Sequence, residues 1–224
     1  MKLYYHPIST TSRPVMLFAA ESRIPLEMKV VDLFTGEHVK PPYSALNPNK
    51  LIPTLDDDGF ILTENSAILK YLADKIDSPA YPKDLKKRAR VNERLDWTST
   101  QLCSDLVYAL VYPQIFDSHK RRSDEAQAAT LERGRERANV WLKVLDEHVL
   151  GASNPYLCGD AITIADYHAA SYVHLAEVIG SDLAAFPNVK RWLGRMKSLK
   201  SWPQVYEVID GFAGSLKGKQ MVAV

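Results

Sequence analysis

Residues 47–72 combine a proline, a hairpin turn and a helix start in an order that suits the binding of a small peptide. Pro53 lacks a backbone N–H, so it belongs at the start, edge or bulge of a strand. A cis peptide bond before Pro53 would leave the backbone N–H and C=O of Ile52 free to pair with another chain. Residues 64–66 begin a helix, where unpaired N–H groups and the positive end of the helix dipole favour a carboxylate. Together these features predict a site for a small acidic peptide.

Four hydroxyl side chains follow the first predicted strand, at Ser9, Thr10, Thr11 and Ser12. Thioredoxins carry a redox CxxC motif in the loop between the first strand and the first helix, and here oxygen replaces sulfur at the same spacing. The protein is therefore not expected to run dithiol chemistry with its own cysteines. Its hydroxyls would instead hydrogen-bond the thiol of another molecule.

The elements that position these residues follow from the hydrophobic pattern. Strands are predicted at residues 2–5, 26–33, 51–55 and 60–63, with helices at residues 13–21 and from residue 63 or 64 onward. Residues 34–46 carry a glycine and two prolines and predict a loop with at most one turn of helix. The resulting order to residue 76 is β-α-β, loop, β-β-α, which is that of a thioredoxin-like half-domain with a small mixed sheet.

The rest of the chain predicts an all-helical domain. Amphipathic helices are predicted at about residues 85–116, 124–150, 163–179, 187–199 and 202–212. The tail, residues 214–224, has little to bury and is expected to fray. We therefore expect an α+β protein with a thioredoxin-like domain at residues 1–78, a linker at residues 79–84 and a helical domain at residues 85–224.

Composition argues against several other classes of protein. The 224 residues carry a net charge of +1 and are 46% hydrophobic and 25% charged, which predicts a soluble globular protein rather than a nucleic-acid-binding one. Cys103 and Cys158 have neither metal-ligand nor CxxC spacing, so no metal site or disulfide is expected. The chain runs from Met1 directly into a strand, and its longest apolar stretch, residues 106–116, is too short to span a bilayer. We expect a cytoplasmic protein that does not associate with membranes.

One carboxylate of the helical domain is interpreted as structural. Thr163 and Asp166 have the spacing of a capping box at the start of a helix, so Asp166 is not expected to act as an acid or base. The histidines His6, His168 and His174 have no partner that the sequence reveals, and no role is assigned to them.

The combined motif resembles the glutathione-binding half of the cytosolic glutathione transferases. NP-x₃-IPTL, followed by DDG and LTENSAILKYL, is most similar to the theta-type and related bacterial members, and the stretch G-D-x-x-T-x-A-D of the helical domain resembles the same family. The resemblance runs the length of the chain. It implies a homodimeric glutathione S-transferase that adds the glutathione thiolate to small hydrophobic electrophiles, with glutathione as co-substrate and no metal.

The resemblance also implies roles for residues of this chain. Ser9 stands at the position of the theta-type serine that stabilises the thiolate, with Thr10, Thr11 and Ser12 within one turn, and Tyr5 stands where other branches use a tyrosine. The residues implied in glutathione binding are His38, Lys50, Leu51, Ile52, Pro53, Glu64 and Asn65. Those implied in the electrophile pocket are Tyr108, Tyr112 and Phe116, whereas Leu102 and Leu106 fit the helical core better.

The chain departs from the family pattern at three positions. Leu51 stands where a polar residue is common, Asn65 where serine is common, and Thr100 where many members carry an acid that reaches the γ-glutamyl amine across the dimer. Two other functions stay open at this point. The same fold supports a glutathione-dependent disulfide or peroxide reductase, and it supports a non-enzymatic protein that binds glutathione or hydrophobic compounds.

Overall fold

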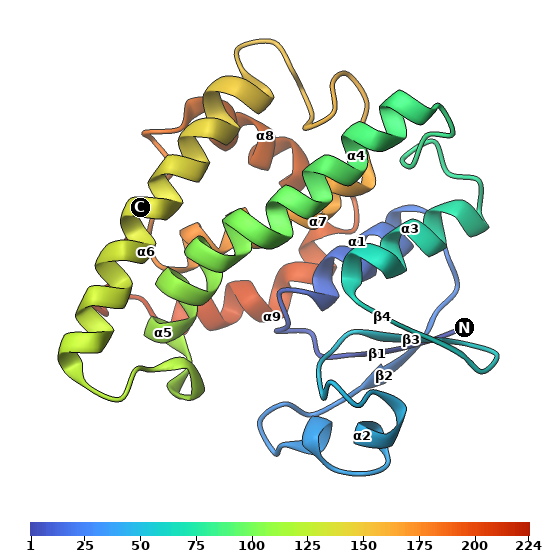
Figure 1. Cartoon of the computed structure of the whole chain (residues 1–224), viewed down its shortest axis with the longest axis horizontal. Coiled ribbons are helices and arrows are strands. Elements are labelled where there is room, and N and C mark those ends of the chain that lie inside the picture. Colours follow the sequence, from blue (N-terminus) through green and yellow to red (C-terminus); the bar gives the residue numbers. More distant parts are fainter.

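The computed structural model describes residues 1–224, which form a small sheet domain and a larger helical domain side by side. The sheet lies near the N-terminus, and the long helices extend away from it (Figure 1). This is the α+β arrangement expected from the sequence, with a thioredoxin-like domain followed by helices.

The sheet contains four strands in the order β2-β1-β3-β4. These are β1 (Lys2–Tyr5), β2 (Glu27–Val30), β3 (Thr54–Asp57) and β4 (Phe60–Thr63). β2 runs parallel to β1, whereas β3 and β4 are antiparallel to their neighbours, with Leu3 opposite Leu55 and Leu55 opposite Leu62. The sheet is therefore mixed, because a helical crossover joins β1 to β2 while a tight turn joins β3 to β4.

Helices cover both faces of this sheet (Figure 1). α1 (Ser12–Glu21) and α3 (Asn65–Lys75) pack on one face, where Leu3, Phe18 and Ile68 are buried in the main core. The other face carries a short 3₁₀ turn (Glu37–Val39) and α2 (Tyr43–Leu46), with Tyr43 packed against Val31 and Ile52. The loop predicted for residues 34–46 thus contains two short helical pieces.

The third strand begins three residues later than predicted. Leu51 lies outside the sheet because its carbonyl accepts hydrogen bonds from the Tyr43 hydroxyl (2.5 Å) and from Asn47 Nδ2 (2.7 Å). The peptide bond between Ile52 and Pro53 is cis, the isomer that the sequence left open. β3 continues to Asp57, so the turn is Asp58-Gly59, with φ of 52° and 92°. Positive φ at both positions is typical of a two-residue hairpin turn.

A long helix forms the side of the helical domain that faces the sheet domain. α4 (Leu85–Trp97) continues without a break into residues Thr98–Val111, which hydrogen-bond in the wider π pattern, and then into α5 (Tyr112–Ile115). α6 (Asp124–Val144) packs against the Thr98–Val111 part of this helix, and a further π-type segment extends α6 to Leu150. A Cβ on Gly134 would lie 2.8 Å from the Ala109 carbonyl carbon, so this contact requires glycine.

α7 (Ile164–Val178) is the central helix, with every residue but Glu177 buried. Its start shows the predicted capping box of Thr163 and Asp166. α7 packs against α1 and α3 of the sheet domain and against α4 and α8 (Pro187–Lys197) of the helical domain. α7 therefore joins the two domains. Burial within it lowers the pKa of His168 to about 3, which keeps that side chain neutral.

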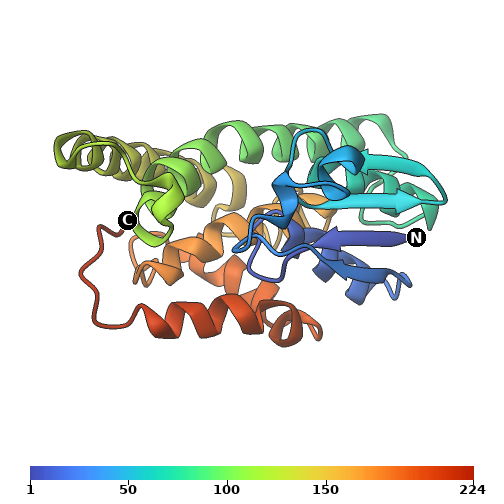
Figure 2. The same cartoon turned by 90° about the horizontal axis from the view of Figure 1, so that it is seen from below.

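The chain ends with α9 (Trp202–Ser215) and a tail that runs along the end of the helical domain farthest from the N-terminus (Figure 2). The side-chain amide of Gln114 on α5 bonds both the N–H (2.7 Å) and the C=O (3.0 Å) of Val222. Ser181 donates to the carbonyl of Val224 (3.2 Å). No helix of the protein has the length and apolar character needed to cross a membrane.

Candidate active site in the cleft between the domains

Two adjoining cavities lie between the sheet domain and the long helix. The smaller measures about 200 Å³ and the larger about 570 Å³. Thr11, Leu51, Ile52 and Tyr108 line both cavities, so the two form one continuous cleft. The smaller part has mostly polar walls, and the larger part is lined mainly by apolar and aromatic side chains.

The smaller cavity presents unpaired backbone donors. The N–H of Ile52 has no hydrogen-bond partner in the protein, whereas its C=O accepts from the Thr11 hydroxyl (2.9 Å). No side chain caps the start of α3, where Glu64 has φ of 66° and ψ of 116°. Asn65 lies buried beside it and donates from Nδ2 to the hydroxyl of Tyr172 (3.2 Å). This part of the cleft can therefore bind a peptide main chain together with a carboxylate.

The first loop turns its four hydroxyls in two directions. Thr10 is buried, its Oγ1 accepts from the Tyr112 hydroxyl (2.8 Å), and its C=O accepts from Ser171 Oγ (2.6 Å). Ser12 is completely buried, and its hydroxyl has no partner. Both side chains thus face the interior between the domains and lie away from the cleft.

Ser9 and Thr11 line the larger cavity, and Thr11 also lines the smaller one. Their hydroxyl oxygens are 3.1 Å apart, and the backbone N–H of Ser12 donates to Ser9 Oγ (3.2 Å). The predicted alternative Tyr5 is partly buried and lines neither cavity. Of the five hydroxyl groups proposed from the sequence, the fold brings two into the cleft.

Arg13 supports this loop from the protein interior, and its role was not predicted from the sequence. The side chain is completely buried, Nη1 donates to the Ile8 carbonyl (2.7 Å), and Nη2 lies 3.5 Å from Thr10 Oγ1. Its guanidinium lies 5.2 Å from the centre of the Tyr206 ring, with no carboxylate at ion-pair distance. Burial lowers the pKa of Arg13. The signal available in the sequence was its position in the first turn of a helix, because a cation is unfavourable beside the positive start of a helix.

The larger cavity contains the remaining predicted residues together with several that were missed. His38 and Lys50 line it, and the buried Nδ1 of His38 has no partner. Tyr108 is 47% exposed, with its ring 5.2 Å from that of Tyr112. Phe116 also contributes to this wall, and the residues not anticipated from the sequence include Phe34, His119 and Phe212. Burial lowers the pKa of His119.

The two leucines that the sequence assigns to the helical core, and both cysteines, lie away from any catalytic role. Leu102 and Leu106 are completely buried in the helical core. Cys103 is buried at the wall of the smaller cavity, and burial raises the pKa of its thiol to about 12. Burial also raises the pKa of Cys158 to about 11, so neither cysteine forms a thiolate at neutral pH. No group of three His, Cys, Asp or Glu side chains is arranged to hold a metal ion.

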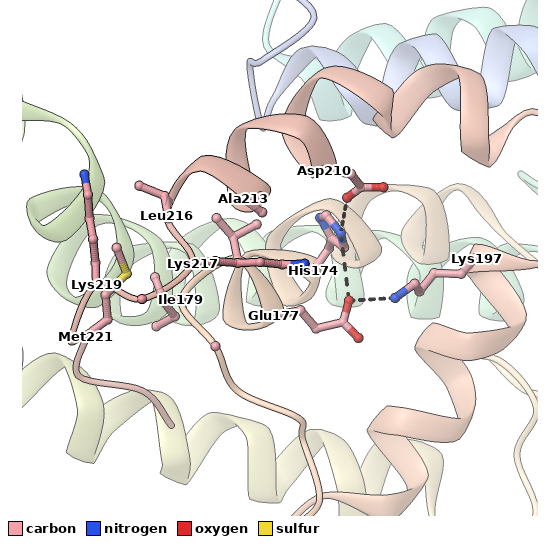
Figure 3. A pocket seen from close by; sticks show the side chains of 14 residues that line it. His174, Glu177, Ile179, Lys197, Asp210, Ala213, Leu216, Lys217, Lys219 and Met221 are labelled. Carbon is pink, nitrogen blue, oxygen red and sulfur yellow. Dashed lines mark hydrogen bonds and ion pairs between the residues drawn. The ribbon is translucent and has the colours of Figure 1, made fainter.

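A third cavity, of about 440 Å³, lies between the end of α7, α9 and the turn that follows it (Figure 3). Here His174 Nε2 is 3.0 Å from Asp210 Oδ1, and Lys197 Nζ is 2.8 Å from Glu177 Oε2. Figure 3 shows these pairs along one wall of the cavity. Each carboxylate already has a partner, and no residue of the cleft takes part, so this cavity is not the candidate site.

The fold and the cleft define a class of protein in which a thioredoxin-like sheet domain and a helical domain enclose a polar cavity beside a more apolar one. The family model described as "Glutathione S-transferase, N-terminal domain" matches residues 8–75, and the one described as "Glutathione S-transferase, C-terminal domain" matches residues 101–200. The chain belongs to the glutathione S-transferase family.

Several solved structures are similar to this chain. Human glutathione S-transferase T1-1 in its apo form is 32% identical over 93% of this chain and 88% of its own, with a TM-score of 0.79. Human glutathione transferase theta-2, in complex with glutathione and an unknown ligand, is 29% identical over 99% of this chain and 92% of its own, with a TM-score of 0.84. A delta-class glutathione transferase of Nilaparvata lugens is 32% identical over 98% of this chain and 99% of its own, with a TM-score of 0.79. The theta-class structures agree with the theta-like resemblance of the sequence.

Proposed function

We propose that this protein conjugates glutathione to hydrophobic electrophiles and that Ser9 stabilises the glutathione thiolate. The observation that carries the proposal is the juxtaposition of three features in one cleft. The unpaired Ile52 N–H and the uncapped start of α3 lie on the polar side, and Ser9 and Thr11 lie beside the aromatic cavity. Each feature matches one part of a γ-linked tripeptide whose thiol must reach an apolar substrate.

Glutathione would bind by adding a short strand to the sheet domain. Its cysteinyl main chain pairs with the N–H and C=O of Ile52. The γ-glutamyl carboxylate lies at the start of α3 with Asn65, while Glu64, which is exposed there, takes the γ-glutamyl amino group. The glycyl carboxylate lies toward His38 and Lys50, which line the adjoining cavity. In this orientation the sulfur faces the first loop.

One hydroxyl is sufficient to ionise the bound thiol. The unperturbed pKa of a thiol is ~8.5, and lowering it by two units requires ~2.7 kcal/mol of preferential thiolate stabilisation. A single charge-assisted hydrogen bond contributes ~1.5–3 kcal/mol. Ser9 is suited to this bond because its oxygen already accepts the Ser12 N–H, which leaves its own proton to donate. The start of α1 and the buried Arg13 add positive potential on the same side.

The second substrate would occupy the larger cavity beside Tyr108, Tyr112 and Phe116. The thiolate sulfur attacks the electrophilic carbon and forms a C–S bond, while the leaving group departs with its electron pair. Burial raises the pKa of Tyr112 to about 12, so its hydroxyl stays protonated and continues to donate to Thr10. The aromatic walls exclude water from the thiolate and favour apolar substrates.

We also propose that the protein is a homodimer and that it works in the cytoplasm. The free cysteines suit a reducing compartment, and the family resemblance implies two copies. Sedimentation at micromolar concentration is expected to give a species of twice the chain mass. A monomer under those conditions would contradict the dimer and leave the conjugation proposal in place.

The ultraviolet absorbance of the thiolate, followed as glutathione is titrated with the protein across pH, tests the proposal. We expect the bound thiol to ionise well below ~8.5 and the shift to be lost in Ser9→Ala. The conjugation rate should then follow the thiolate fraction and fall about tenfold for each pH unit below the bound pKa. Binding without any pKa shift, or turnover of mixed disulfides without conjugate formation, would contradict the proposal.

A further inference from the structure

Thr11 connects the two halves of the cleft through one hydrogen-bonded chain. Its Oγ1 donates to the Ile52 carbonyl (2.9 Å) and lies 3.1 Å from Ser9 Oγ. Ile52 is the residue whose main chain would pair with glutathione, and Ser9 is the proposed thiolate donor. Among the four hydroxyls of the loop, only Thr11 lines both cavities.

The direction of each hydrogen bond in this series follows from counting the protons available to donate. A hydroxyl has one proton, and Thr11 gives its proton to the Ile52 carbonyl. Ser9 must therefore donate to Thr11 while it accepts from the Ser12 N–H. All of these bonds point toward the Ile52 carbonyl. In the free protein the protons of both cleft hydroxyls are thus engaged within the protein, and Ser9 must redirect its proton from Thr11 to donate to a thiolate.

Docking of a substrate amide changes the strength of the hydrogen bond from Thr11 to the Ile52 carbonyl. The Ile52 carbonyl oxygen has two lone pairs and accepts the substrate N–H on the one that Thr11 does not use. The bond from Thr11 weakens, because an oxygen that accepts one hydrogen bond is a poorer acceptor for a second. A thiolate beside Ser9 is a stronger acceptor than a shared carbonyl, because hydrogen bonds to charged groups are roughly twice as strong as neutral ones. Since the Ser9 and Thr11 oxygens are 3.1 Å apart, a sulfur that contacts one is within reach of the other.

We propose that Thr11 couples main-chain docking to thiol activation: an amide N–H bound at Ile52 releases the Thr11 hydroxyl, which then donates to the thiolate beside Ser9. The inference rests on the proposed function and assigns a second donor to the same site. It makes the protein selective for thiols in which the thiol-bearing residue itself carries an amide N–H. Simple thiols that fit the cleft are bound without the second donor.

The test compares two thiols on three forms of the protein. One thiol is glutathione, and the other is its ester analogue, in which the cysteinyl N–H is replaced by oxygen. The proteins are the wild type, Thr11→Val, which keeps the side-chain shape, and Thr11→Ser, which keeps the hydroxyl. The thiol pKa in each complex is read from thiolate absorbance at saturating protein, so that weaker binding of the ester does not enter the comparison.

In the wild type we expect the bound glutathione thiol to be more acidic than the ester thiol by about one pKa unit, a tenfold difference in thiolate fraction below the pKa. Thr11→Val should abolish this difference, and Thr11→Ser should restore it. Equal acidity of the two thiols on the wild type, or an unchanged difference on Thr11→Val, would overturn the coupling while the conjugation proposal stands. A glutathione thiol that shows no shift on the wild type would overturn both.

Discussion

Two polar clusters of this protein use similar groups in opposite ways. Asp166, buried at the start of α7, has both carboxylate oxygens occupied. Oδ1 accepts from the Leu157 N–H (2.8 Å) and Trp192 Nε1 (2.9 Å). Oδ2 accepts from the Thr163 N–H (2.8 Å) and hydroxyl (3.0 Å). In the cleft, by contrast, the Ile52 N–H and the buried His38 Nδ1 have no partner in the protein.

The difference separates polar groups that stabilise the fold from polar groups that are available to a ligand. A buried cluster whose hydrogen bonds are complete loses stability when one member is removed, because its partners are left unpaired. A cluster with unpaired donors at a cavity loses ligand binding when a member is removed, and the fold changes little. Variants in the two clusters should therefore affect different measurements.

The largest expected effect is on stability, in Asp166→Ala. This change leaves the buried N–H groups of Leu157, Thr163 and Trp192 without an acceptor. We expect the free energy of unfolding to fall by about 3–5 kcal/mol, measured by urea denaturation. Activity per folded molecule should stay near that of the wild type. A loss below about 1 kcal/mol would show that Asp166 is not a structural hub.

A smaller effect is expected at Asn65, where the fold places a buried amide at the uncapped start of α3. Asn65→Leu should raise the KM for glutathione about tenfold, which corresponds to one lost hydrogen bond to a carboxylate. The kcat should change little, because the thiol contacts remain. Equal losses in KM and kcat would indicate that Asn65 acts on the thiol and not on the γ-glutamyl group.

Tyr112→Phe removes the hydroxyl that donates to buried Thr10 and retains the ring that lines the larger cavity. We expect a loss of about 1 kcal/mol in stability, seen in thermal unfolding, because one buried hydrogen bond disappears. The apparent affinity for hydrophobic electrophiles should be retained. A large loss of that affinity would show that the hydroxyl itself contacts the second substrate.

The smallest effect is expected in the third cavity, at Asp210→Asn. Asp210 is half-exposed and pairs with the buried His174 across 3.0 Å, where an amide oxygen can still accept the hydrogen bond. Stability should change by less than about 1 kcal/mol. Conjugation should be unaffected, because this cavity and the cleft have no lining residue in common. A marked fall in activity at unchanged stability would assign this cavity a role in function.

Local patterns were sufficient to predict the hairpin, the start of α3 and the capping box at Thr163. Each depends on residues that are close in the sequence. The division of the loop hydroxyls was not predictable in the same way. Thr10 faces the interior because Tyr112 and Ser171 reach it from 102 and 161 residues away. Such contacts depend on how α5 and α7 pack against the sheet domain.

Contacts between distant elements also account for the missed members of the cleft. Phe34, His119 and Phe212 come from three separate parts of the chain and meet only in the larger cavity. Arg13 was counted as an ordinary helix residue because its partners, the Ile8 carbonyl and the Tyr206 ring, are identified only in the folded protein.

The most direct test of thiolate stabilisation by Ser9 is a paired measurement on Ser9→Ala. If the cleft hydroxyls act on the substrate and not on the fold, kcat/KM for conjugation should fall about a hundredfold near neutral pH. The free energy of unfolding should fall by no more than about 1 kcal/mol, because the Ser12 N–H keeps its bond to the Ser9 carbonyl. Conjugation that persists at the wild-type rate, or a loss of activity that follows a loss of stability, would contradict the account.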